Sequence, residues 1–548
     1  MTGLLTVADA VTEPGDDETT ARRWRIDPDA CGRLLGWLAI TIPLLVWAAA
    51  LWPVVFVADS MDTWNQAAEG PVYNWHPPAY TYLQRLAYLS VHSPWAVTIV
   101  QCLVMAWAIR RVLDVAIAAG ARRWPTYAFG VVIAALPPVG AFTSHLIKDV
   151  PFTIGFLLCL SVLAREAVRR AGLLAADEAP KPWRAEAMLG LGLALIAFSR
   201  VNGLIVLVGI ALSALFLARQ RLRALVAVVV VVAAFLGVTR LLYPALDVRP
   251  VSDHLRASIF VSDLGAVFAR DPDAVPDEAV DDLEMYASQE EWAAGVNCHW
   301  AGNPFQVQFY QPKPVSLSDL REAWRRVLRS HTFFLIGNHL CAASSAWNPI
   351  PPDEELVYRQ TVWDVVVPNE QGVVSDPLWD DLGTDARQLL DWIGYGTASQ
   401  ILLWRAPTWM YALALLLAVA VIRHRRWWAL WLLGPFAAQV VSVIAIAGPH
   451  YRYMAPAWIG AVLLLPAGWM LAMRRATAGP DAGSAADGLA AGQVNGAGEL
   501  GEVGGREAGI EVPERGEHVL DPIASDAPAS VQQVHEPAHR HLEPTEGP

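Results

Sequence analysis

Ten long apolar runs constrain the fold of this 548-residue chain more than any other feature. A bilayer core offers no water to the backbone, so a run of about 20 apolar residues crosses it only as a helix. Charged residues make up only 17% of the chain, against about 25% in soluble domains. We therefore predict an all-α polytopic membrane protein with about ten transmembrane helices, at 34–57, 94–109, 125–143, 150–165, 185–199, 203–218, 222–242, 404–422, 427–447 and 454–473.

The connections between these runs alternate in charge. Arginine and lysine gather before the first run, in every second connection and after the last run, at 22–33, 110–123, 165–184, 219–223, 423–426 and 474–475. Short cytoplasmic connections carry an excess of these residues, so both termini are predicted to be cytoplasmic. The connections 58–93, 144–149, 200–202, 243–403 and 448–453 then face the opposite side of the membrane.

This topology divides the chain into five segments. Residues 1–33 form a disordered cytoplasmic leader, and 34–242 hold transmembrane helices 1–7 with a long first outer loop at 58–93. Residues 243–403 are too long and polar for a simple loop and are expected to form an extracytoplasmic domain of mixed secondary structure. Within it, 316–340 reads as one helix, with Ser316 and Asp319 as a capping box. Residues 404–475 hold helices 8–10, and 476–548 form a disordered acidic tail.

Charge is segregated along the chain. Residues 243–400 hold 10 Lys/Arg against 24 Asp/Glu, a net charge of −14, and 476–548 carry −10, whereas the rest of the chain carries +11. The membrane body is therefore basic, and acid gathers in two water-facing regions. The acidic total of −13 argues against a nucleic acid as partner.

Two of the 5 cysteines, Cys298 and Cys341, lie in the large outer region, while the others lie in or beside apolar runs. No C-x-x-C spacing occurs, which disfavours a metal or redox motif. Because oxidation is allowed only outside the cytoplasm, we predict a disulfide between Cys298 and Cys341.

The first outer loop is the richest in chemical side chains. Asp59 stands where the first run leaves the membrane, so its partly desolvated carboxylate can act as a base or bind a cation. Capping of the following helix is the alternative. Asp62 lies on the same helix face, so the pair could hold a divalent ion, although an exposed helix face explains Asp62 equally well. His76 precedes two prolines and, taken alone, suits a structural hydrogen bond.

The three short outer connections, 144–149, 200–202 and 448–453, each hold one cation where positive charge is normally scarce: Lys148, Arg200 and Arg452. Snorkelling is the alternative for Lys148, and capping of the next helix is the alternative for its neighbour Asp149. Together the three cations and the carboxylates on one membrane face suit an anionic lipid head group that carries a reacting sugar.

These motifs resemble the GT-C superfamily of integral membrane glycosyltransferases, which includes the family-39 and protein mannosyltransferase-like enzymes. Asp59-Ser60 followed by Trp75-His76-Pro77-Pro78 is similar to their first periplasmic loop. Residues 148–152, Lys-Asp-Val-Pro-Phe, resemble a stretch of some bacterial members, and 200–203, Arg-Val-Asn-Gly, resemble their Arg-x-Asn-Gly. Residues 324–340 resemble a helix after their large loop, and 452–456 resemble their last motif. The resemblance covers roughly 34–242 and 316–475.

The resemblance implies a polyprenyl-phosphate sugar as donor, in a bacterial cell membrane. Asp59 would be the base that deprotonates the acceptor hydroxyl, with inversion at the anomeric carbon. Lys148, Arg200 and Arg452 would stabilise the leaving polyprenyl phosphate. Further substrate contacts are expected from Asp62, Trp75, His76, Asp149, Asn202 and Tyr453. The mannosyltransferases commonly show a closer acidic pair than Asp59 and Asp62, which puts dependence on a divalent metal ion in doubt.

Two other classes compete with the enzyme. A transporter or flippase for a lipid-linked sugar or other anion would use the same cations without chemistry, but transporters usually show internal repeats and polar residues near mid-membrane. A scaffold with an adhesive outer domain leaves the three cations unexplained. We therefore expect Asp59, His76, Lys148, Arg200 and Arg452 to converge on one outward cavity, with Asp59 about one sugar away from the cations.

Overall fold

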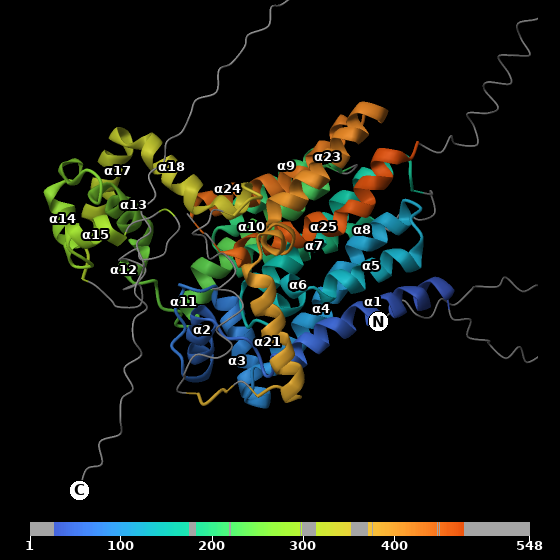
Figure 1. The fold of residues 1–548 in the computed structure, drawn as a ribbon, viewed down its shortest axis with the longest axis horizontal. Helices are drawn as coiled ribbons and strands as arrows, with labels where there is room; N and C mark the ends of the chain where they lie inside the picture. Colours follow the sequence, from blue (N-terminus) through green and yellow to red (C-terminus); the bar gives the residue numbers. More distant parts are fainter. Residues whose placement is uncertain are drawn as a thin grey trace, which may run out of the picture. The chain divides into compact units, whose positions relative to one another are not determined.

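The computed structural model describes residues 27–174, 182–218, 221–295, 298, 314–351, 371–374, 376–446, 448 and 450–475, so most of the predicted leader and the acidic tail lie outside the described residues. The described chain is all-α (Figure 1), and its only β contacts are two isolated bridges, Val55 with His145 and Tyr73 with Arg249. The expectation of a helical protein is thus confirmed for these residues.

Seven stretches among the described residues are long and apolar enough to cross a membrane, and an eighth counts if a bent pair is one span. The prediction of ten is not reached, because α8 (Pro182–Ser199) and α9 (Gly203–Leu217) fall short in hydropathy or length. The bent pair is α5 (Arg123–Ala135) with α6 (Pro137–Thr143), which meet at 65°. The seven are α1 (Pro28–Ala50), α4 (Trp95–Ala118), α7 (Asp149–Arg170), the Arg221–Ala245 stretch that begins with α10 (Arg221–Gly237), α23 (Ala406–His424), the Trp427–Ala445 stretch that ends in α24 (Gly434–Ala445), and α25 (Tyr451–Met473).

Helix α1 begins and ends earlier than the predicted span 34–57. Asp27 caps it by accepting a hydrogen bond from the Asp29 amide, and Pro28 suits the first helical turn. The helix ends before Pro53, and the apolar residues beyond are not helical: Val55 exchanges backbone hydrogen bonds with Ser144 and Leu146. Apolar character alone therefore placed the end of this span too late.

Helix α4 is longer than the predicted span 94–109, because charged residues continue it. The Arg110 guanidinium donates to Asp114 Oδ2 over 2.8 Å, and the Tyr127 hydroxyl donates to the other oxygen of Asp114 over 2.8 Å. These pairings satisfy the charges within the helix bundle, so the helix runs on to Ala118.

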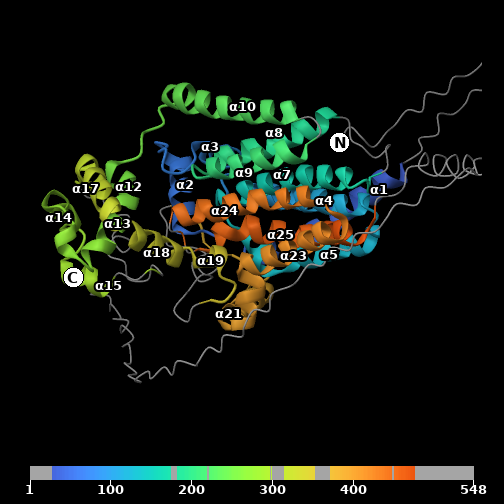
Figure 2. The ribbon, with the colours of Figure 1, turned by 90° about the horizontal axis from the view of Figure 1, so that it is seen from above.

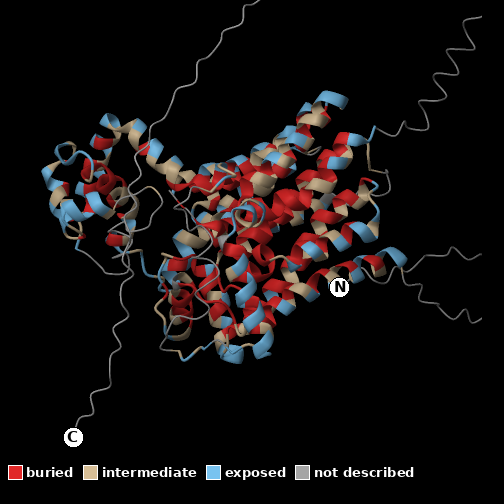
Figure 3. Cartoon of the chain, in the orientation of Figure 1, coloured by how far each residue is buried: buried red, intermediate tan, exposed pale blue. Residues whose placement is uncertain are grey.

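Helix α25 is largely buried, as α7 is, and packs against α4, α7 and α23 (Figure 3). Helices α7 and α8 also pack closely. A Cβ atom added to Gly155 would lie only 2.6 Å from the carbonyl oxygen of Gly192, so glycine is needed at this crossing. By contrast, α10 lies at the edge of the bundle against α8 and α9, and most of its surface stays exposed (Figure 2).

The first outer loop folds into two helices, α2 (Ala58–Glu69) and α3 (Pro78–Val91). They pack around a small core in which Trp64 and Tyr80 are buried together with Phe56 and Leu146. Because Phe56 precedes α2 and Leu146 precedes α7, this core ties the loop to the bundle beside the candidate site.

The region predicted as one extracytoplasmic domain has two parts. Its first part has a core of its own, made by α13 (Ser258–Phe268), α14 (Asp277–Glu284), α15 (Gln289–Gly295) and α17 (Leu317–Ser330). Further on, α19 (Ser344–Trp347) and α21 (Asp380–Tyr395) contribute buried residues to the core of the bundle instead. No strand occurs among the described residues here, so the expectation of mixed secondary structure is wrong for them.

The predicted helix 316–340 is in fact two helices. Ser316 caps α17 by accepting a hydrogen bond from the Asp319 amide, as expected. The Ser316 amide, however, donates to Asp282 over 3.1 Å rather than closing a capping box. The helix is interrupted at His331, and a second helix, α18 (Thr332–Ala342), continues toward the bundle.

Two links hold α18 in place. The Cα atoms of Cys298 and Cys341 lie 5.6 Å apart, and the two cysteines form a disulfide. His339 joins α13 to α24 of the bundle. Its Nε2 is 2.7 Å from Asp263 Oδ1 in α13, and its Nδ1 is 2.9 Å from the Ile444 carbonyl oxygen in α24. Both neighbours are acceptors, so both contacts are hydrogen bonds only in the protonated imidazolium.

Candidate functional site

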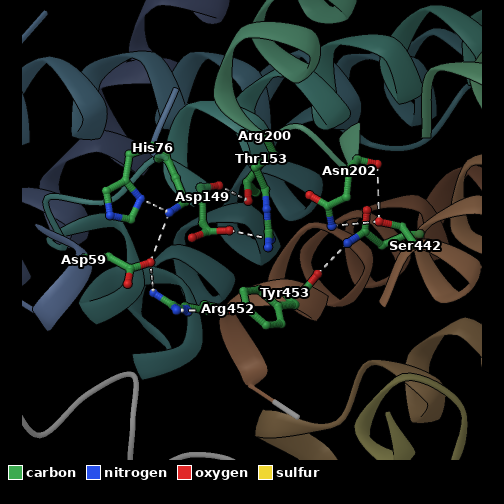
Figure 4. A network of polar contacts seen from close by, with 11 residues as sticks. Asp59, His76, Asp149, Thr153, Arg200, Asn202, Ser442, Arg452 and Tyr453 are labelled. Carbon is green, nitrogen blue, oxygen red and sulfur yellow. Dashed lines mark hydrogen bonds and ion pairs between the residues drawn. The ribbon is translucent and has the colours of Figure 1, made fainter. Parts of the chain in front are cut away.

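The residues predicted from separate connections meet at one end of the helix bundle (Figure 4). They come from the start of α2, the turn before α3, the start of α7, the connection between α8 and α9, and the start of α25. These places are adjacent because α25 packs against α7, and because the segment before α2 pairs with the segment before α7.

Asp59 is the centre of the cluster. Its Oδ2 accepts hydrogen bonds from Lys148 Nζ and from an Arg452 terminal nitrogen, each over 3.0 Å. The three side chains are only 12–18% exposed. A single carboxylate oxygen therefore bridges two cations in a largely water-excluded place, where such interactions are stronger than at a surface.

His76 extends the cluster on the other side of Lys148. Its Nδ1 lies 2.6 Å from Lys148 Nζ, and its Nε2 lies 3.2 Å from Asp62 Oδ2. Burial lowers the pKa of His76, and the Lys148 charge lowers it further against the opposing effect of Asp62. A neutral ring that accepts from Lys148 at Nδ1 and carries its proton toward Asp62 fits these contacts.

Arg200 forms a second, fully buried ion pair. It donates to Asp149 Oδ1 over 2.5 Å, and the two side chains are 6% and 0% exposed. Its guanidinium also lies 4.3 Å from the ring centroid of Tyr453. Arg452 donates to the Tyr453 hydroxyl over 3.2 Å, so this tyrosine connects the two ion-paired groups.

Two further predicted residues lie beside the network. Trp75 stacks edge-on near His76, with ring centroids 6.2 Å apart. Asn202 donates to Ser442 Oγ over 2.9 Å and thereby joins the start of α9 to α24 (Figure 4). Asn202 thus has a structural partner in addition to any role in binding.

The electrostatics of Asp59 follow from its neighbours. Burial by itself would raise the pKa of Asp59, but the Arg452 and Lys148 charges outweigh burial and hold the pKa well below its usual range. Asp59 is therefore ionised at neutral pH, and it is a weak base for as long as both cations contact it.

Several expectations need correction at this point. Asp59 does not stand one sugar away from the cations but contacts two of them directly. It is not an N-cap either, because Val57 occupies that position. Lys148 is paired rather than merely snorkelling, and the Asp149 side chain pairs with Arg200 rather than capping α7.

A divalent metal ion does not fit between Asp59 and Asp62. Asp59 Oδ2 already contacts two cations, and Asp62 Oδ2 accepts from the Gln66 amide over 2.8 Å and faces His76. Within the described parts of the chain, no group of three His, Cys, Asp or Glu side chains is arranged to hold a metal. We derive no step through a metal ion.

His450 belongs to the cluster, although the sequence interpretation assigned it no role. It is 4% exposed and lies within electrostatic range of Arg452, Asp59 and Arg200. The available signal was its position two residues before Arg452 in the same outer connection. Ser442, the partner of Asn202, had no such signal, because it lies within an apolar run.

With this geometry established, comparison with known proteins adds no relative. No family model, curated protein or solved structure matches the chain. The inference of function therefore depends on the side chains of the cluster and on the motif resemblance.

Proposed function

We propose that this protein is a membrane glycosyltransferase of the GT-C type, which transfers a sugar from a polyprenyl-phosphate donor to an acceptor outside the cytoplasm. The observation that carries the proposal is the Asp59 carboxylate held between Lys148 and Arg452 at one end of a membrane-length helix bundle. A base and two phosphate-binding cations are the groups that this transfer requires.

The charges of the cluster favour an anionic ligand. Arg200 is neutralised by the buried Asp149, whereas Lys148 and Arg452 share the single charge of Asp59. Asp62 faces His76 and is 44% exposed, so water screens its charge. The excess positive charge therefore belongs to Lys148 and Arg452, and these two residues, rather than all three cations, are the phosphate ligands. Arg200 acts indirectly by holding the ring of Tyr453.

The chemistry then follows from the contacts. Asp59 takes the proton of the acceptor hydroxyl, and the hydroxyl oxygen forms a bond to the anomeric carbon of the sugar. The bond from that carbon to the phosphate oxygen breaks, and its electron pair leaves with the polyprenyl phosphate. Lys148 and Arg452 stabilise the negative charge that grows on this phosphate. Attack opposite to the leaving group inverts the anomeric centre.

The membrane setting suits such a donor. A polyprenyl chain remains among lipid tails, while its phosphate lies at the membrane boundary, which is where we propose that the cluster at the starts of α2, α7 and α25 lies. We place the protein in a bacterial cell membrane as a multi-pass protein with cytoplasmic termini and with the cluster on the outer side.

The test is an assay of the purified full-length protein in detergent with a panel of polyprenyl-phosphate sugars, read out as released polyprenyl phosphate. Lys148→Gln should abolish release from any active donor. Arg474→Gln is the matched control, because Arg474 is an arginine at the far end of α25 that donates to the Gly120 carbonyl. Movement of a labelled donor across vesicles without release of polyprenyl phosphate would instead support a transporter.

A further inference from the structure

The arrangement around Asp59 raises a difficulty for a simple base mechanism. Lys148 and Arg452 both donate to the same oxygen, Asp59 Oδ2. A carboxylate in this position has little tendency to accept a proton from a sugar hydroxyl. The same two cations are also the proposed ligands of the donor phosphate. The Asp59 carboxylate and the phosphate therefore compete for the same pair of cations.

We infer that the donor phosphate displaces Asp59 from Lys148 and Arg452, so that donor binding itself releases the base. This inference rests on the proposed function and concerns the regulation of the same site. In the resting protein the carboxylate occupies the place of the phosphate. In the complex the phosphate takes over both cations, and Asp59 becomes available to the acceptor.

The exchange is electrostatically balanced. One singly charged anion replaces another on Lys148 and Arg452, so no cation is left unpaired in a largely buried place. Arg452 can offer a phosphate two parallel N–H donors. In the present structure, one terminal nitrogen of Arg452 donates to Asp59 and the other donates to the Tyr453 hydroxyl. Arg200 is unaffected, because its partner Asp149 is fully buried.

The groups around the released carboxylate would then favour proton uptake. Asp59 remains largely buried, which raises the pKa of a carboxylate, and Asp62 adds a like charge from the same helix. The bound phosphate adds a second like charge. His76 and His450 face the site as neutral rings at neutral pH, since burial lowers the pKa of both. Among the described residues, Lys148 and Arg452 are the cations that contact Asp59, and the phosphate engages them.

A reaction order follows. The donor binds first, and the acceptor is deprotonated only when the phosphate is in place. After the transfer, Asp59 gives the proton to water and, again a carboxylate, competes with the polyprenyl phosphate for the two cations, which promotes product release.

The decisive experiment measures binding rather than turnover. A short-chain polyprenyl methyl phosphate, a diester with the single charge of the donor, is titrated as the lipid phosphate into the full-length protein in lipid nanodiscs, with inorganic phosphate in a second series. Asp59→Asn keeps the side-chain size but removes the competing charge, so it should bind the lipid phosphate about tenfold more tightly, equivalent to about 1.4 kcal/mol. Glu69→Gln is the matched control: it removes the same charge from the exposed last residue of the same helix α2, and it should change affinity by less than about twofold.

A second measurement uses the unaltered protein, so the test does not depend on folding of a variant. Binding of the lipid phosphate near pH 5 should be accompanied by proton uptake, measured by calorimetry in buffers of different ionisation enthalpy. Tighter binding by Asp59→Asn together with this uptake supports the exchange, and a parallel gain for inorganic phosphate shows that the head group suffices. Unchanged or weaker binding by Asp59→Asn, or binding of lipid phosphate without proton uptake, would overturn it.

These outcomes are separate from those of the proposed function. If no donor in the panel is turned over, the glycosyltransferase proposal fails, whatever the affinities are. If donors are turned over but Asp59→Asn gains no affinity for phosphate, the enzyme stands and the release mechanism is wrong.

Discussion

The buried pair of Asp149 and Arg200 offers the sharpest test of the structure itself. Asp149→Asn leaves Arg200, which is only 6% exposed, without its counter-charge. Removing one partner of a buried ion pair costs about 3–5 kcal/mol, because the remaining charge is desolvated and uncompensated. The ratio of folded to unfolded protein should then fall by roughly two to three and a half powers of ten.

The size of this effect depends on burial, so an exposed pair provides the control. Glu186 and Arg223 lie 3.3 Å apart, but their side chains are 32% and 57% exposed. Pairs of this kind contribute about 0–1 kcal/mol, so Glu186→Gln should hardly change stability. Asp149→Asn combined with Arg200→Met removes both charges and should recover most of the stability lost by Asp149→Asn alone.

The assay is unfolding of the purified protein in mixed micelles, followed by intrinsic tryptophan fluorescence. Where unfolding is irreversible, the rate of loss of the folded state at one temperature replaces the equilibrium value. The reasoning is refuted if Asp149→Asn and Glu186→Gln are equally stable, or if the double variant is no more stable than Asp149→Asn.

Three further predictions concern activity and pH. Asp59→Asn should lower turnover by about a hundredfold or more, because the base is lost. Arg452→Ala should weaken donor binding as well as the rate. Both are checked by measuring the release of polyprenyl phosphate at increasing donor concentration. Burial lowers the pKa of His339, but Asp263 outweighs burial and raises it above 6.5. The stability that this link contributes should therefore be complete below about pH 6.5 and be lost as pH rises through the higher pKa of the folded state. The measurement is the rate of proteolysis at a series of pH values, and His339→Gln should abolish its dependence on pH. Truncation after about residue 480 should leave turnover unchanged at equal expression, because the acidic tail cannot pack a core.

The helices of the apolar runs could be predicted from the sequence, but their ends could not. Apolar runs predict a helix wherever the backbone must form its hydrogen bonds within the segment, and each predicted span contains a helix. The ends depend on contacts that a hydropathy pattern does not contain. Residues 51–57 are as apolar as the helix before them, yet Val55 pairs with the chain before α7. Conversely, Arg110 and Asp114 neutralise each other, so α4 continues where apolar character stops.

The candidate site shows the same division between what sequence can and cannot predict. The rarity of cations in short outer connections was enough to single out Lys148, Arg200 and Arg452, because the positive-inside bias makes such residues costly without a partner. The bias does not say which anion each cation would contact. Asp59 and Arg452 are 393 positions apart, and their contact requires α2 and α25 to begin at the same place. The carboxylate proposed as base thus contacts the two cations that we propose as phosphate ligands. A base that is already paired can act only if something else takes its place, and the donor phosphate is the anion that the proposed reaction supplies.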